Sequence, residues 1–221
     1  MYNITLIGTH HGELGKCNPD ELYKIIELIN PDVIFEELSS DLFNIIYNAN
    51  SPNSQPDLLT EIKCVKKYLQ NHKIKHVPVD IDIRYLSDNE LNWMYDTFEK
   101  YDDYNKIDNE QSLLTAHHGF NFLNSDKNLY LSEQNNIAIK NILRIDTNKN
   151  ELFRVHQLFI KQNDIRENAM LQNIYNYSKE NQYTQAVFFL GCGHRKSIIS
   201  KIAEYEKLST IKLNWTIYGA T

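Results

Sequence analysis

Residues 2–12 read "YNITLIGTHHG", an apolar run that ends in two glycines and two histidines. The apolar part predicts a buried strand over 2–7, because apolar and β-branched residues favour strands in a core. Glycine at the end of a strand lets the backbone turn sharply and lets a ligand approach closely. The stretch therefore predicts the first strand of a sheet and a candidate site at the carboxyl end of that strand.

Strands and helices alternate on either side of the middle of the chain. Further strands are expected at 32–38, 74–81, 185–191 and 211–219, and helices at 18–30, 39–48, 57–72 and 195–207. Asn18 and Pro19 are typical of a helix N-cap and of a first helical position. Strands joined by helices of this length form right-handed crossovers in a parallel sheet. We expect an α/β fold, a single domain over 1–221 with a mainly parallel central sheet flanked by helices.

The middle of the chain, residues 86–180, shows helical periodicity and no convincing strand. Residues 151–181 contain neither proline nor glycine, which predicts one long helix. Residues 50–56, "NSPNSQP", form the clearest expected loop. We expect 86–180 to be a helical insertion that caps the sheet, where the wall of a ligand pocket or a lid would lie.

Composition excludes several classes of protein. The formal net charge of -6 argues against a general nucleic-acid binder. No run approaches the ~18 apolar residues of a membrane span. We also expect no signal peptide, because no basic region leads into an apolar segment. The three cysteines have no CxxC spacing, which fits a reducing compartment. We expect a cytoplasmic protein with no membrane or nucleic-acid partner; its oligomeric state is open, with a homodimer as one option.

Polar residues lie at the ends of the first four expected strands. These ends read "GTHHG" (8–12), "FEEL" (35–38), "VDID" (79–82) and "LGCGH" (190–194). In a parallel sheet the carboxyl ends of the strands share one edge, and ligands bind there. A single histidine after a strand is more often a surface loop residue, but two imidazoles with a carboxylate form a ligand set for a divalent transition metal.

Two further features sharpen the pattern at the ends of the chain. "GTHH" (8–11) and "GCGH" (191–194) are both Gly-x-x-His motifs. A glutamate follows the second strand in "PDVIFEEL" (31–38). Together these features resemble the TraB/PrgY/Tiki family, which belongs to a superfamily with the ChaN-type proteins and the erythromycin esterases. The resemblance implies Glu37 rather than Glu36, because the family has a Pro-x-x-x-x-x-Glu spacing.

Two more elements are compared with that family. "RENAMLQN" (166–173) is similar to its Arg-Asp/Glu-x-x-Met-x-x-Asn helix. The family often has an Asp-Arg pair after its third strand, whereas this chain has "VDIDIR" (79–84), so that Asp80 and Asp82 compete for the role. Asp80 lies nearer the end of the strand and is preferred.

The resemblance implies a metal-dependent hydrolase. His11, Glu37 and His194 would hold one divalent ion, Mn²⁺ as the first guess with Co²⁺ or Zn²⁺ behind it. The ion would activate water for hydrolysis of a peptide, amide or ester bond in a small-molecule or peptide substrate. Arg166 would join these three as a catalytic residue by stabilising the oxyanion. Without the motif, Arg166 would be interpreted as one member of an ordinary ion pair on the helix surface.

Neighbouring residues would support this site. Glu36 or Asp80 would accept a proton or orient a ligand histidine, and Asn173 shares a helix face with Arg166. His10 lies outside the family spacing. His117 and His118 are adjacent on an expected helix, so at most one of them would face the site.

Two alternatives remain open. In a metal-independent esterase of the erythromycin-esterase type, His11 would act as general base on water, positioned with Glu37 and Arg166. In a protein of the ChaN type, the same edge would bind haem or another metal-bearing ligand without catalysis. Cys192 fits a small packing residue better than a nucleophile, because no basic partner is spaced for it.

Overall fold

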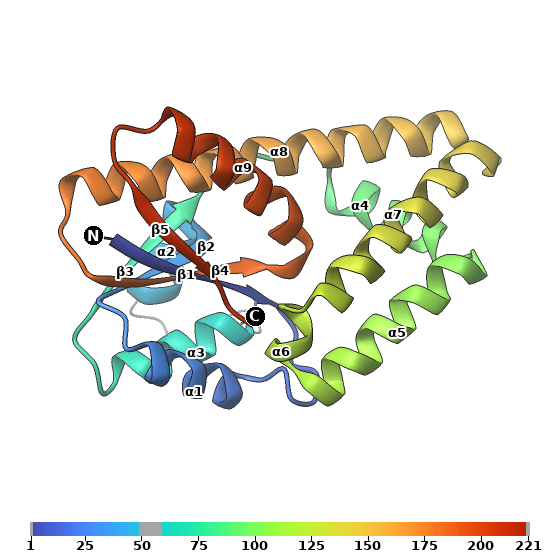
Figure 1. Ribbon diagram of the computed structural model, residues 1–221. Coiled ribbons are helices and arrows are strands. Elements are labelled where there is room, and N and C mark those ends of the chain that lie inside the picture. Colours follow the sequence, from blue (N-terminus) through green and yellow to red (C-terminus); the bar gives the residue numbers. More distant parts are fainter. Residues whose placement is uncertain (1, 49–58, 220–221) are drawn as a thin grey trace.

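A central parallel sheet organises the protein, of which the computed structural model describes residues 2–48 and 59–219. Within these residues the sheet has five strands in the order β3-β2-β4-β1-β5, all of them parallel (Figure 1). The strands are β1 (Tyr2–Thr9), β2 (Val33–Ser39), β3 (Lys75–Asp80), β4 (Gln185–Gly191) and β5 (Leu213–Ile217). The predicted α/β fold with a parallel sheet flanked by helices is confirmed.

The middle of the sheet is the most apolar part of the sequence. β4 lies between β1 and β2, and every residue from Ala186 to Gly191 is buried. A strand that is covered on both faces needs apolar residues at every position rather than at alternate ones. "AVFFL" (186–190) meets this need, which explains why it occupies the centre.

Helices connect the strands and extend the molecule. Their bounds are α1 (Pro19–Ile29), α2 (Ser40–Asn48), α3 (Thr60–Leu69), α4 (Asp88–Phe98), α5 (Asp102–His118), α6 (Phe120–Leu123), α7 (Asp126–Ile145), α8 (Lys149–Glu180) and α9 (Arg195–Leu208), with a short 3-10 helix, η1 (Cys192–His194). Asn18 caps α1, and its side chain accepts from the backbone N–H groups of Asp20 and Glu21, as the sequence predicts. The expected long helix at 151–181 is α8.

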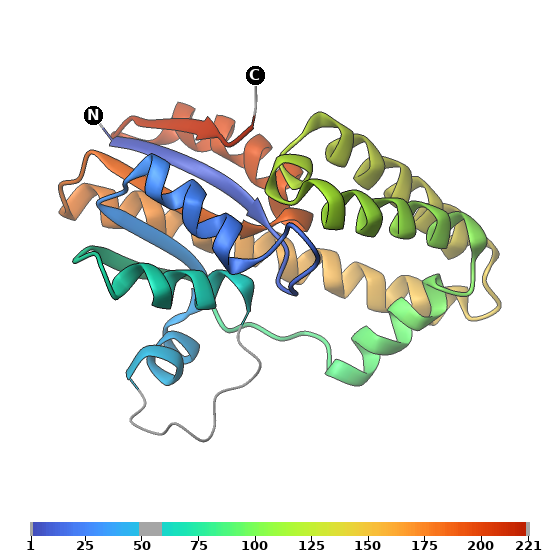
Figure 2. The ribbon, with the colours of Figure 1, turned by 90° about the horizontal axis from the view of Figure 1, so that it is seen from below.

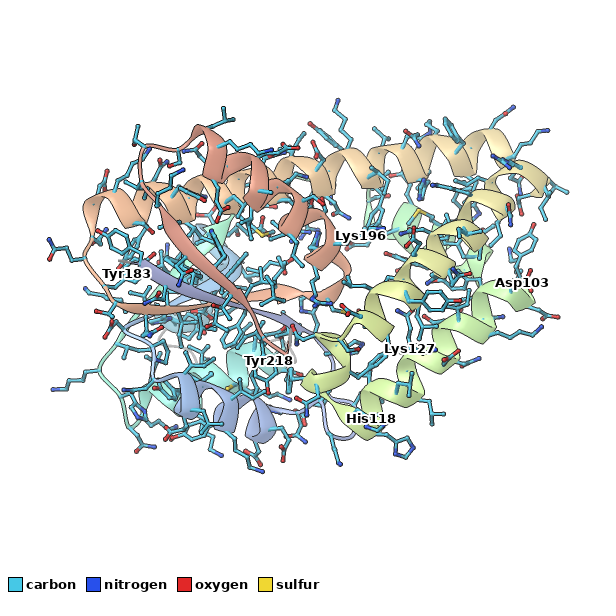
Figure 3. The ribbon with its side chains drawn as sticks, viewed as in Figure 1. Asp103, His118, Lys127, Tyr183, Lys196 and Tyr218 are labelled. Carbon is cyan, nitrogen blue, oxygen red and sulfur yellow. The ribbon has the colours of Figure 1, made fainter. Side chains whose placement is uncertain are left out.

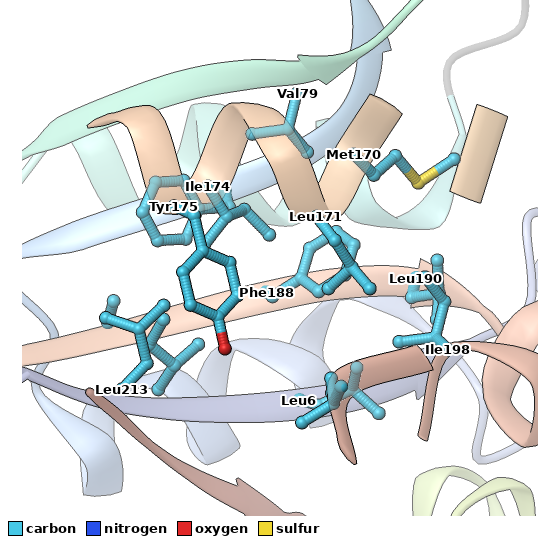
Figure 4. Close-up of a cluster of buried hydrophobic side chains, with 14 of the residues drawn as sticks. Leu6, Val79, Met170, Leu171, Ile174, Tyr175, Phe188, Leu190, Ile198 and Leu213 are labelled. Carbon is cyan, nitrogen blue, oxygen red and sulfur yellow. The ribbon is translucent and has the colours of Figure 1, made fainter. Parts of the chain in front are cut away.

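The two faces of the sheet are covered by different helices. α1 and α3 pack on one face, and α9 with the C-terminal half of α8 packs on the other (Figures 1 and 2). On the face covered by α8 and α9, Met170, Leu171 and Ile174 of α8 pack against Leu6 and Phe188 of the sheet (Figure 4). Successive residues of a strand point to opposite faces, so each strand contributes side chains to an apolar core on both faces.

Helices from the middle of the chain form an arm beside the sheet, whereas α2 and α6 lie against strands β2 and β1. α4, α5, α7 and the N-terminal half of α8 pack around their own apolar cluster, which includes Phe98, Ile142, Leu152 and Val155. The arm lies next to the ends of the β1 and β4 arrows (Figure 1). Elements α4–α8 fill the expected helical insertion, residues 86–180. The number of domains in the chain stays a prediction.

One junction ties the arm to the sheet. The backbone N–H of Gly8 donates to Asn124 Oδ1 at 2.7 Å, and Asn124 Nδ2 donates to the Gly8 carbonyl at 2.9 Å. A Cβ on Gly8 would lie 3.1 Å from that Asn124 oxygen, so the close approach favours glycine. The glycine of the "GTHH" motif therefore has a structural role.

Some expectations have different bounds or lie outside the described residues. The helix expected at 57–72 begins at Thr60 and ends at Leu69. The loop expected at 50–56 lies outside the described residues. In the part of the chain that is described, no helix is both long and apolar enough to cross a membrane.

Candidate active site

Four strands and one helix bring the candidate residues to the carboxyl edge of the sheet. His11 follows β1, Glu37 lies near the end of β2, Asp80 ends β3, and His194 follows β4. Arg166 reaches the same edge from α8. Residues that are far apart in the sequence thus share one edge, because parallel strands end side by side.

Arg166 lies between two buried carboxylates. Its Nη2 donates to Glu37 Oε1 at 2.7 Å and to Asp80 Oδ2 at 2.6 Å, and its Nε donates to the same Asp80 oxygen at 3.0 Å. Burial acts to lower the pKa of Arg166, but the bonds to Asp80 and Glu37 outweigh it and raise that pKa. The guanidinium is therefore charged at physiological pH, and its single positive charge is shared between the two carboxyl groups.

The packing of α8 explains how Arg166 reaches the edge. Met170, one turn further on, is fully buried against the sheet. Asn173, a further turn on, donates from Nδ2 to the Val79 carbonyl at 2.8 Å. Asn173 thus holds the end of β3 against α8. Asp80 pairs with Arg166, whereas Asp82 is exposed and lies beside Arg84.

Gly191 brings Glu37 and His11 together. Its backbone N–H donates to Glu37 Oε2 at 2.7 Å. A Cβ at this position would lie 3.3 Å from that oxygen and 3.3 Å from His11 Nε2. The absence of a side chain on Gly191 therefore lets the imidazole and the carboxylate meet over the same point of the backbone. Both oxygens of Glu37 accept a hydrogen bond.

His11 has a buried partner that the sequence analysis missed. Glu61 of α3 lies with its Oε1 3.2 Å from His11 Nδ1 and also accepts a short hydrogen bond from Thr9 Oγ1. The side chain of His11 is 51% exposed and that of Glu61 is 10% exposed. A carboxylate on Nδ1 fixes the ring and its tautomer, and leaves Nε2 to face a ligand.

The pair shifts the pKa values of both groups. The hydrogen bond with Glu61 raises the pKa of His11 above its ordinary 6.5, against the opposing effect of burial. Burial acts to raise the pKa of Glu61, but the bonds from His11 and Thr9 outweigh it and lower that pKa. Glu61 is therefore ionised, and His11 keeps its proton to a higher pH than an ordinary imidazole does.

His194 has a similar partner. Its Nδ1 lies 2.7 Å from Glu167 Oε1, and its Nε2 lies 3.5 Å from Glu37 Oε1. Ser197 and Lys201 donate to Glu167 Oε2 at 2.5 and 2.7 Å. Burial opposes ionisation of Glu167, but its hydrogen bonds with His194, Lys201 and Ser197 lower its pKa. Each histidine is thus held at Nδ1 by a buried glutamate.

The two missed glutamates have a signal in the sequence. Glu61 shares a helix face with Cys64, Val65 and Tyr68, all of them fully buried. A carboxylate at position i, with apolar residues at i+3, i+4 and i+7, lies on the core side of a helix. Glu167 stands in the same relation to Met170, Leu171 and Ile174. An acidic residue on an apolar face requires a partner, and here that partner is a histidine.

Glu36 does not orient a candidate histidine, contrary to expectation. It points to the opposite face of β2 from Glu37, where its Oε1 lies 2.7 Å from His76 Nδ1 and its Oε2 accepts from Tyr47 at 2.6 Å. Strand alternation separates the two adjacent glutamates in this way. The expected orienting role belongs to Glu61 and Glu167, and Asp80 is occupied by Arg166.

The other singled-out residues lie apart from this set. His10 is exposed and bonds through Nδ1 to the Gly12 carbonyl at 2.7 Å. His117 and His118 are exposed at the end of α5, where His118 projects outward from the lower side of the arm (Figure 3). Burial raises the pKa of Cys192 to about 11, so its thiolate is scarce at neutral pH.

The fit of the predicted metal ion depends on Glu37. The described residues contain no group of three His, Cys, Asp or Glu side chains placed to hold an ion. Glu37 is the partner of Arg166 and of the Gly191 N–H rather than a free ligand. The ligand set His11, Glu37 and His194, with Mn²⁺, Co²⁺ or Zn²⁺, stays a prediction.

An open groove gives access to this edge. It has a volume of about 530 Å³, and His11, Glu37, Asp80 and Arg166 line it. α2, the segment after β3, α4 and α8 supply the rest of its walls. A ligand in the groove would thus touch the exposed ring of His11 and the guanidinium of Arg166.

Comparisons with known proteins give little further guidance. No family model matches the chain, and no curated protein matches it. A solved structure similar to it is that of a Bacillus cereus protein, with 11% sequence identity and a TM-score of 0.37. The match covers 97% of this chain and 64% of the Bacillus protein, so the chain spans less than two thirds of it. The resemblance to the TraB/PrgY/Tiki family stays a prediction.

Proposed function

We propose that this protein is a hydrolase in which His11 acts as general base on a water molecule, without a requirement for metal. The observation that supports it best is the His11–Glu61 pair. A half-exposed imidazole is held at Nδ1 by a buried, ionised glutamate and faces a groove with its other nitrogen. This arrangement suits an imidazole that accepts a proton at Nε2.

The neighbouring residues have distinct roles in this proposal. The water oxygen bonds to a carbonyl carbon of an ester, and His11 takes the proton of that water. Arg166, with Nε and Nη2 engaged by Asp80 and Glu37, offers its remaining nitrogen, Nη1, to the carbonyl oxygen as negative charge develops there. The carbon–oxygen bond to the leaving group then breaks, and the proton on His11 passes to the leaving alkoxide.

A metal-dependent hydrolase is the second candidate, and one observation favours it. Both His11 and His194 are held at Nδ1 by glutamates, which is the usual environment of histidines that bind a metal through Nε2. His11, Glu37 and His194 would hold the ion. When bound, it would supply a hydroxide at neutral pH and polarise a carbonyl group. The haem- or metal-binding alternative of the ChaN type stays a prediction.

The experiment is hydrolysis of a small panel of p-nitrophenyl esters and p-nitroanilides. We expect His11→Ala to lower kcat/KM by ~10²-fold or more, the usual range for loss of a general base. His10→Ala is the matched control, because it removes the adjacent exposed histidine, whose ring bonds to the Gly12 carbonyl. Equal kcat/KM in the two variants would show that His11 contributes no more to hydrolysis than an exposed surface histidine. That result would refute the proposal.

A further inference from the structure

A small slot opens beside His11, and Arg166 is not among the residues that line it. Its volume is about 20 Å³, room for an occupant the size of one water molecule. Thr9, His11 and the three glutamates at 36, 37 and 61 line it, together with apolar side chains such as Ile62 and Phe189. The slot shares His11, Glu37, Leu38 and Leu59 with the groove, so it is reached from there.

One oxygen in the lining has no partner. Glu61 is 8% exposed, and its Oε2 is buried with no hydrogen-bond partner among the described residues. Leaving a buried carboxylate oxygen unpaired costs free energy that a donor in the slot would recover. The other two glutamates are satisfied, Glu36 by His76 and Tyr47, and Glu37 by Arg166 and the Gly191 N–H.

The charge of the surroundings indicates which donor fits. The groove is lined by five carboxylates and two guanidinium groups, which gives it a negative potential. A metal ion needs several oxygen ligands at once, and the described residues offer no such group. A quaternary ammonium is too large for the slot.

We propose that the slot binds a primary ammonium group of the substrate, with Glu61 Oε2 as its acceptor. The proposal rests on the hydrolase function proposed above and names its substrate class. Because the slot adjoins His11, the ammonium lies within one or two bonds of the carbonyl carbon that the water attacks. The substrates are therefore esters or amides of α-amino acids with a free amino group.

The first test compares alanine methyl ester with N-acetylalanine methyl ester at pH 7, where an α-amino group of pKa ~8 is mainly protonated. We expect kcat/KM to be about tenfold or more higher for the free amine, as for a hydrogen bond to a charged group. Ile62→Phe would fill the slot and bring the ratio of the two substrates close to one. Ile46→Phe is the matched control, because Ile46 belongs to the same apolar cluster but does not line the slot.

A second measurement is independent of catalysis. Methylammonium chloride should raise the Tm of the wild type and of Ile46→Phe above the value in sodium chloride of equal concentration, and should not do so in Ile62→Phe. Ester hydrolysis without preference for the free amine would overturn the substrate class and leave the hydrolase in place. Stabilisation by methylammonium with no hydrolysis of either ester would refute the hydrolase and retain the ammonium site. An absence of both effects would refute both.

Discussion

Arg166 donates to one oxygen of Asp80 from two nitrogens, Nε at 3.0 Å and Nη2 at 2.6 Å, and the same Nη2 also reaches Glu37 at 2.7 Å. The planar guanidinium thereby joins the ends of β2 and β3 to α8. A lysine carries one compact ammonium group and cannot reproduce this geometry. Replacing Arg166 with lysine therefore separates the catalytic contribution of Arg166 from its structural contribution.

We expect Arg166→Lys to lower turnover by ~10²–10³-fold with little change in substrate affinity, because the contact to the oxyanion forms mainly in the transition state. Steady-state kinetics and a thermal melt measure the two effects. Arg154→Lys is the control, since Arg154 pairs with Glu90 and Glu151 on the exposed surface of the arm. A loss of Tm with full turnover per folded molecule would show that Arg166 is structural only.

The pH profile tests the His11–Glu61 pair. His11 acts as a base only when unprotonated, so kcat/KM should rise with pH through the pKa of His11, which Glu61 raises above 6.5. Glu61→Gln removes the negative charge, lowers that pKa and should move the acid limb of the profile to lower pH. The plateau should also fall, because the ring is less firmly oriented. Glu13→Gln, which alters an exposed partner of Lys63, should leave the limb in place.

The sequence predicted the sheet and the edge where the candidate residues meet. Both follow from local patterns: apolar runs such as 185–190, the cap at Asn18, and polar residues directly after each strand. Strand alternation likewise separates Glu36 from Glu37. These features depend on neighbours in the chain, which a single sequence contains.

The sequence did not predict the partners of the two histidines. Glu61 and Glu167 lie 50 and 27 residues away from the rings that they hold, on helices whose rotation and position depend on tertiary packing. Periodicity places each glutamate on a buried face but does not identify what it meets there. Glu37 also pairs with Arg166, which is 129 residues away in the sequence. This pairing determines whether the Glu37 carboxylate is free to bind a metal ion.

A chelator distinguishes the two hydrolase candidates. The metal-independent site predicts that protein purified without a histidine tag keeps its activity after dialysis against EDTA. The metal-dependent site predicts that activity is lost and that Mn²⁺ restores it. It also predicts that His11→Ala, His194→Ala and Glu37→Ala each abolish bound metal, measured by elemental analysis, whereas His10→Ala does not. Equal metal in the wild type and in all three variants would refute the ligand set His11, Glu37 and His194.

The adjacent glutamates of β2 give the last prediction. Glu37 faces Arg166 and the groove, while Glu36 is 2% exposed and bonds to His76 and Tyr47 beneath α2. Glu37→Gln should therefore remove most of the activity, because it unbalances the charge of Arg166 at the site. Glu36→Gln should instead lower stability by ~1–3 kcal/mol, the cost of weakening buried hydrogen bonds to a charged group.

Turnover per folded molecule and urea unfolding of the two variants separate these effects. Each variant is the control for the other, since both replace one carboxylate oxygen by an amide nitrogen at neighbouring positions of one strand. We expect Glu36→Gln to retain most of its turnover and to unfold at lower urea, with an unchanged slope of the unfolding free energy. Loss of activity in Glu36→Gln with full activity in Glu37→Gln would mean that Glu36, not Glu37, faces the reacting group, and would refute the site as proposed.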